Sequence, residues 1–142
     1  MKPSKKATKT WRSLIDSAHH AYLKGEYGEA VRSYILAKET AEKAWGPSHP
    51  AVGETLRRLG DVYLQEGNLL GAESTFMAAV KAYDSAEVRD SRAVADCLMR
   101  TADALRLMGR EQAANEYQGQ ARKLLLMIER AKPATAGGEK SG

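Results

Sequence analysis

The chain has 142 residues, of which 43% are hydrophobic and 28% are charged, and its formal net charge is +4. This length suits one compact domain or a short repeat array. Leu, Ala, Glu, Arg and Lys outnumber Val, Ile and Thr, a balance that favours helices over sheets. No run approaches the roughly 18 apolar residues needed to cross a membrane. We therefore expect a soluble, cytoplasmic, helical protein.

The positive charge is concentrated at the two ends of the chain. Residues 1–12 contribute +5 and residues 131–142 contribute +1, which leaves −2 for the residues between them. The body is therefore not basic, which argues against nucleic acid as the partner. Binding of nucleic acid or another anionic surface by the basic start of the chain stays an alternative, and it would depend steeply on salt. The single cysteine, Cys97, excludes an intrachain disulfide and is compatible with a reducing compartment.

Taken in chain order, the sequence predicts six helices in three hairpins over residues 10–132. A disordered basic arm is expected at residues 1–9 and a disordered tail at residues 133–142. The helices are expected at about residues 10–24, 27–45, 48–66, 69–85, 91–108 and 111–132, which gives units of about 10–47, 48–89 and 90–132. Glycine closes the first helix of each hairpin because a left-handed residue at a helix end favours glycine. Gly46-Pro47 stops the second helix, Ser48 is expected to cap the third, and Pro133 marks the end of the last.

These boundaries follow a repeat with a period of 42 residues, and a fixed period of this size is typical of stacked helical units. The residues that keep the period are Gly25, Gly67 and Gly109, Ala30, Ala72 and Ala114, Ala37, Ala79 and Ala121, and Leu14, Leu56 and Leu98. The small residues, together with Ala18, Gly60 and Ala102, would let paired helices approach closely. Larger residues such as Tyr34 and Phe76 would fill the core.

Several motifs resemble the tetratricopeptide repeat. The second unit reads Leu59-Gly60-x-x-Tyr63-x-x-x-Gly67-x-x-x-x-Ala72-x-x-x-Phe76-x-x-Ala79, and the first unit repeats this pattern with its aromatic residue moved by one place. Gly46-Pro47-Ser48-His49-Pro50 resembles the joint of the longer, kinesin-light-chain-type repeats. The small-residue pattern argues against HEAT-like repeats of similar period. The last unit has Gln118 in place of the aromatic residue, as terminal units are often atypical.

The resemblance implies an all-α, right-handed α-solenoid in which the first helix of each hairpin lines a concave groove. It also implies a non-enzymatic scaffold or adaptor whose partner is a protein, a peptide or a helix. The residues expected to line this peptide groove are Arg12, Ile15, Asp16, His19, Glu54, Arg57, Arg58, Asp61, Gln65, Asp96, Met99, Arg100, Asp103 and Arg106. Two interpretations stay open, since these are either solvated helix faces or a peptide-binding surface. Arg57, Arg100 and Arg106 are the strongest candidates for binding.

A groove that clamps a carboxylate tail, as in chaperone-binding members of the family, is not expected. Such a groove uses lysines, asparagines and an arginine, and only Arg100 agrees with that set. Asp96 at a matching place would repel an acidic tail.

No motif predicts an enzyme, a metal site or a cofactor. His19 and His20 are adjacent, so on a helix they point in different directions and do not share a metal easily. Cys97 is interpreted as a small apolar residue rather than a nucleophile. Ser48-His49 is explained by capping and packing in the joint.

The expected last helix carries an apolar stripe that is broad for a terminal helix. The stripe is made by Ala121, Leu124, Leu125 and Ile128, with Leu126 and Met127 beside it. It either caps the core or pairs with another copy or a partner, which would make the protein a homo-oligomer through this helix.

Overall fold

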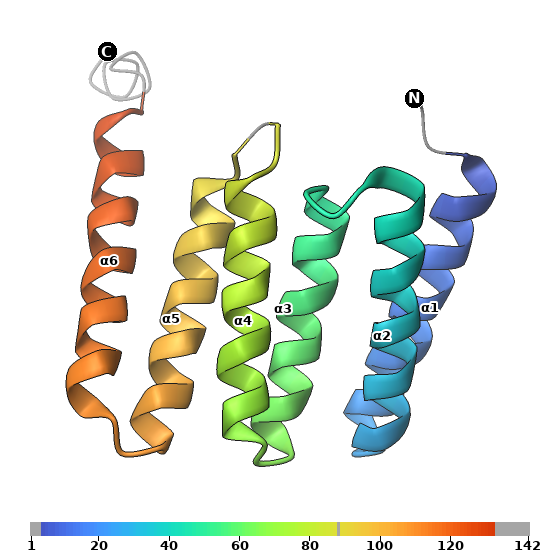
Figure 1. Cartoon of the computed structure of the whole chain (residues 1–142), viewed down its shortest axis with the longest axis horizontal. Coiled ribbons are helices and arrows are strands. Elements are labelled where there is room, and N and C mark those ends of the chain that lie inside the picture. The colour runs from blue at the N-terminus through green and yellow to red at the C-terminus, as the bar shows by residue number, and fades with distance from the viewer. Residues whose placement is uncertain (1–3, 88, 133–142) are drawn as a thin grey trace, which may run out of the picture.

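The computed structural model describes residues 4–87 and 89–132. Within these residues it contains α1 (Lys5–Leu23), α2 (Tyr27–Trp45), α3 (Pro50–Gln65), α4 (Leu69–Asp84), α5 (Ser91–Leu107) and α6 (Glu111–Arg130). The helices stand side by side with alternating direction, from α1 and α2 at one end of the array to α6 at the other (Figure 1). Each packs on its neighbours along the chain. The expected all-α solenoid of three helix hairpins is confirmed.

The same turn closes the first helix of each hairpin. Gly25, Gly67 and Gly109 have φ angles of 78°, 83° and 80°, in the left-handed region that favours glycine. In each case the next amide donates to the carbonyl five residues earlier: Glu26 to Ala21 at 2.9 Å, Asn68 to Tyr63 at 2.8 Å, and Arg110 to Leu105 at 2.9 Å. This is the capping pattern in which a left-handed glycine lets the chain reverse at once. The 42-residue period therefore fixes three equivalent antiparallel hairpins.

The start of α1 differs from the expectation. The helix begins at Lys5, because the Ser4 hydroxyl accepts a hydrogen bond from the Ala7 amide at 3.0 Å. This amide lies in the first turn and would otherwise have no hydrogen-bond partner within the helix. Lysine and alanine then continue the helix readily. The expected non-helical arm is therefore wrong for residues 5–9. Residues 1–3 and the expected tail at 133–142 lie outside the described residues.

Other helix ends depart from expectation by a residue or two. His49, rather than Ser48, caps α3: its Nδ1 accepts from the Ala51 amide at 3.0 Å, and Pro50 occupies the first helical position, where no amide is needed. The start of α5 at Ser91 is as expected, because Asp90 caps the helix by accepting from the Ala93 amide at 3.0 Å. The last helix ends at Arg130.

Small residues let the helices of each hairpin approach closely, as the sequence indicates. Ala30, Ala72 and Ala114 are fully buried. Phe76 of α4 is also fully buried, and its ring lies against Gly60 of α3 so closely that a Cβ on Gly60 would be 2.5 Å from it. In the last unit Gln118 stands where the aromatic residue would be, and it accepts a hydrogen bond from Arg106 instead of filling a core.

Candidate functional site

A network of charged side chains joins α3 to α5 on one face of the array. The Asp61 carboxylate accepts from Nη1 of Arg57 at 3.4 Å and from Nη1 of Arg100 at 2.5 Å. Nε of Arg100 also donates to Asp96 at 3.0 Å. Since Asp61 and Arg100 are 39 residues apart, this network is a tertiary contact between consecutive repeats. We call the surface formed by these four residues and Tyr22 the inner face.

Burial and charge oppose each other in this network. Burial raises the pKa of Asp61 above its usual 3.8, and the attraction of Arg100 and Arg57 only partly offsets that effect. Desolvation alone would lower the pKa of Arg100, but the carboxylates of Asp61 and Asp96 raise it overall. At neutral pH the two arginines and two aspartates neutralise one another. The arginines singled out from the sequence are therefore already held by the fold.

Tyr22 of α1 extends the inner face toward the first unit. Its ring stacks with His19 at 6.3 Å between centroids and lies 6.0 Å from the ring of Tyr27. Burial raises the pKa of Tyr22, and the charge of Asp61 raises it further while Arg100 opposes it. The tyrosine hydroxyl thus lies within the field of the α3–α5 network. Tyr22 is the displaced aromatic residue of the first unit's repeat pattern, and the groove predicted from the sequence did not include it.

Some residues expected in the groove have other roles. Ile15 is only 2% exposed and lies in the core, because it shares the buried stripe of Trp11 and Ala18. Arg106 is directed to α6, and its guanidinium donates to Glu111, Asn115 and Gln118, each at 3.0 Å. The expectation that Ile15 and Arg106 line a groove is therefore wrong.

The other residues expected in the groove differ in their exposure and in the side chains that they contact. Arg58 donates to Glu54 at 3.2 Å, and both are half-buried. Met99 is half-buried against the core. The guanidinium of Arg12 lies 4.8 Å from the ring centroid of Trp11. The exposed side chains are those of Arg12, Asp16, His19, Gln65 and Asp103.

Two of these exposed residues give the surface an acidic character. Within residues 4–87 and 89–132, neither Asp16 nor Asp103 forms a salt bridge. Arg57 and Arg100 beside them are matched by carboxylates, whereas the exposed Arg12, one turn from Asp16, forms no salt bridge among these residues. The unmatched groups on this side of the array are therefore two carboxylates and one guanidinium.

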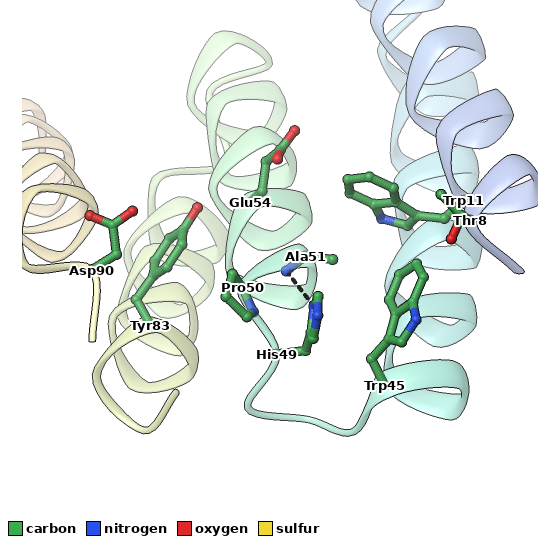
Figure 2. Close-up of a pocket in the computed structure, with 9 residues that line it drawn as sticks. All are labelled: Thr8, Trp11, Trp45, His49, Pro50, Ala51, Glu54, Tyr83 and Asp90. Carbon is green, nitrogen blue, oxygen red and sulfur yellow. Dashed lines mark hydrogen bonds between the residues drawn. The ribbon is translucent and has the colours of Figure 1, made fainter. Parts of the chain in front are cut away.

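A pocket opens beside the N-terminus of α3, at the helix ends opposite the glycine turns (Figure 1 and Figure 2). Its volume is about 410 Å³. Aromatic rings and carboxylates from several helices surround it, and we call it the end pocket. Its principal lining residues are Trp11, Trp45, His49, Glu54, Tyr83 and Asp90. Sequence reasoning missed it because these residues are spread over 80 positions. The signal that could have found most of them is their position near a helix end.

The family model described as Tetratricopeptide repeat matches residues 12–85, just over half of the chain. The chain belongs to the tetratricopeptide repeat family. No curated protein matches the sequence.

Solved structures of other tetratricopeptide repeat proteins share the fold. BtubC (BKLC) from P. vanneervenii superposes with a TM-score of 0.79 at 16% identity, over 87% of this chain and 49% of that one. The N-terminal domain of stress-induced protein-1 (STI-1) from C. elegans superposes with a TM-score of 0.70 at 17% identity, over 92% of this chain and 100% of that one. The chain thus spans about half the length of BtubC. At these identities the similarity concerns the fold alone.

The family indicates the general kind of role that such repeats have. Tetratricopeptide repeats are generally modules for protein–protein interaction, and their folds are typically non-catalytic scaffolds. Among the described residues, no group of three or more His, Cys, Asp or Glu side chains is placed to hold a metal ion. None of the helices described here is both long enough and apolar enough to cross a bilayer.

Proposed function

We propose that this chain is a non-enzymatic adaptor that binds a peptide or a partner helix along the inner face, the side expected to be concave. The observation that carries the proposal is the ion-pair network that joins two repeats, from Asp61 to Arg100 and Asp96, with Tyr22 of the first repeat close enough to be affected by the charge of Asp61. A surface that spans several repeats can read an extended segment at several points. We place this activity in the cytoplasm, since the free thiol of Cys97 is compatible with a reducing compartment.

The unmatched carboxylates beside the inner face favour a partner segment that is basic rather than acidic. Arg57 and Arg100 are matched by Asp61 and Asp96, while Asp16 and Asp103 stand exposed beside them. Complementary charge on a partner would speed its approach and fix its orientation. Apolar contact with Tyr22 would supply further binding energy.

Site-specific cross-linking tests this surface without disturbing the charge network. A photoreactive amino acid is placed at Asp103, one helical turn from Arg100 of the inner face, or, as a matched control, at Glu39. Both positions are exposed, and Glu39 lies on the side of α2 opposite its buried residues Ala37 and Ala41. We expect one native partner to be cross-linked from Asp103 and not from Glu39. Equal cross-linking from the two positions would contradict the proposal.

Charge reversal of Arg57 or Arg100 is a poor test, because it would add a third carboxylate to the network that already holds Asp61 and Asp96. A fold weakened by that repulsion would lose its partner for a structural reason. The exposed Asp16 and Asp103 can be replaced by asparagine instead, since neither forms an ion pair among the described residues. We expect their double replacement to weaken binding at low salt and to leave the melting temperature unchanged.

Self-assembly through α6 is a second candidate, supported by the exposure of its apolar side chains. Leu126 is 51% exposed and Met127 is 62% exposed. An apolar face at the end of a repeat array is also where a further helix would stack. Light scattering at high protein concentration tests this role. A dimer that dissociates when Leu126 is replaced by glutamate would support it, and a monomer at every concentration would remove it.

A further inference from the structure

The end pocket has a rigid aromatic wall. The rings of Trp11 and Trp45 meet edge to face with centroids 5.9 Å apart, and Trp45 stacks on His49 at 5.0 Å. The indole of Trp11 is fixed further, because its Nε1 donates to the buried hydroxyl of Thr55 at 2.9 Å. A cavity with a preformed wall binds a ligand without first ordering its own side chains.

The opposite wall of the pocket is equally fixed. Tyr83 at the end of α4 packs over Gly53 of α3, where an added Cβ would lie 2.9 Å from the ring. Tyr83 and Asp90 therefore face the tryptophan cluster across the first turn of α3, with Glu54 between them (Figure 2). The pocket thus draws its walls from three different repeats.

The formal charges that line the pocket are carboxylates. Glu54 and Asp90 are among its lining residues, and no lysine or arginine of the described chain is. Glu54 is partly matched by Arg58 at 3.2 Å. One oxygen of Asp90 caps α5 by accepting from the Ala93 amide, which leaves its second oxygen for another donor.

Two further observations describe the surroundings of the pocket. Burial is the main cause that raises the pKa of Tyr83 to about 12; the charge of Cys97 raises it further, Arg57 lowers it, and Glu54 and Asp90 make smaller contributions that raise it. The N-terminus of α3 would ordinarily attract an anion. Here the Ala51 amide is already occupied by Nδ1 of His49.

We propose that the end pocket binds an arginine side chain of the partner segment. The inference rests on the proposed function, and it names the anchor by which a basic segment would be held. A guanidinium is planar, so it stacks on aromatic rings and donates to carboxylates at the same time. Its apolar stem fits the aromatic wall of the pocket. The chain already makes one contact of this kind, between Arg12 and Trp11.

The fluorescence of the two tryptophans measures ligand binding in the pocket directly. The sequence contains only Trp11 and Trp45, and both line the pocket, so all tryptophan fluorescence originates there. The probes are a capped Gly-Arg-Gly peptide and its citrulline counterpart, which has nearly the same shape without the charge. We expect a saturable fluorescence change with the arginine peptide and a much weaker one with the citrulline peptide.

A conservative replacement of Asp90 tests whether its carboxylate contributes to binding. Asparagine at position 90 can still cap α5, because asparagine is as good an N-cap as aspartate. Asp90→Asn should weaken binding of the arginine peptide about fivefold, as expected for a partly exposed ion pair. Glu39→Gln, which removes one exposed carboxylate outside the pocket, should leave the affinity unchanged.

The test of the arginine site and the test of the proposed function have distinguishable outcomes. Equal binding of the two peptides, no fluorescence change with either, or equal affinity in Asp90→Asn and Glu39→Gln would each overturn the arginine site. Cross-linking of the native partner from position 103 does not depend on the pocket. If it persists while the arginine peptide fails to bind, the inner-face proposal stands and the end-pocket inference is wrong.

Discussion

Replacing Gly60 with alanine tests the close approach of α3 and α4. An ideal Cβ at Gly60 would lie 2.5 Å from Cε1 and 2.6 Å from Cδ1 of Phe76, distances far below van der Waals contact. Phe76 is fully buried, so its ring cannot swing into solvent to make room. The added methyl group must therefore move the two helices apart or force the ring from its rotamer.

Two opposing effects set the change in the free energy of unfolding. Alanine is favoured over glycine in a helix interior by about 1 kcal/mol, and overpacking a core costs about 1–3 kcal/mol. We expect Gly60→Ala to lower the free energy of unfolding by about 1 kcal/mol net. Gly119 of α6 is the matched control, since an added Cβ there would meet nothing within 4 Å. Gly119→Ala should raise the free energy of unfolding by up to about 1 kcal/mol.

Urea and thermal unfolding of both variants measure the difference. The helix-propensity effect is common to the two, so the difference of about 2 kcal/mol reports the contact with Phe76 alone. For a domain of this size, a change of about 1 kcal/mol moves the melting temperature by about 3–5 °C. Combining Gly60→Ala with Phe76→Leu should recover much of the loss. Equal stabilisation by Gly60→Ala and Gly119→Ala would refute the packing argument.

Three further predictions concern buried polar groups. Thr55→Val removes the acceptor for the Trp11 indole and should destabilise the fold by about 1–3 kcal/mol in urea unfolding; a change below about 0.5 kcal/mol would show that the indole finds another partner. Burial raises the pKa of Tyr83 from 10.0 to about 12, so the unfolded chain ionises first. The wild type should then lose about 3 kcal/mol between pH 10 and 12 that Tyr83→Phe retains, and parallel alkaline stability curves would contradict this. The raised pKa of Asp61 means that the folded state takes up this proton first. The wild type should gain stability relative to Asp61→Asn as the pH falls toward 3.8, and a constant difference from about pH 6 downward would count against it.

The sequence predicts the hairpins well because local rules determine them. Gly25, Gly67 and Gly109 adopt the left-handed conformation that the 42-residue period suggests, and α2 has the bounds expected for it. The errors lie at helix starts, where neighbouring residues compete to cap. Ser4 caps α1, so that this helix begins earlier than the charge pattern indicates. His49 caps α3 in place of Ser48.

The candidate site is predicted less well, because helical spacing gives only the face on which a residue lies. The pattern places Arg57 and Asp61 on one face correctly, yet it also assigns Ile15 and Arg106 to the groove. Ile15 belongs to the stripe that packs inward, and Arg106 meets α6 across the hairpin. Whether a side chain faces solvent or a neighbouring helix depends on how far the helices are rotated as they pack.

The sequence by itself therefore determined the repeat, the hairpins and the small residues between helices, since each depends on contacts within one unit. Only the tertiary structure decided which side chains meet across units. Asp61 reaches Arg100 and Trp11 reaches Thr55 over separations of 39 and 44 residues. The same stacking gathers the rings and carboxylates of the end pocket. These contacts depend on the angle and distance at which one repeat stacks on the next, and those are set by the packing of all the side chains between them.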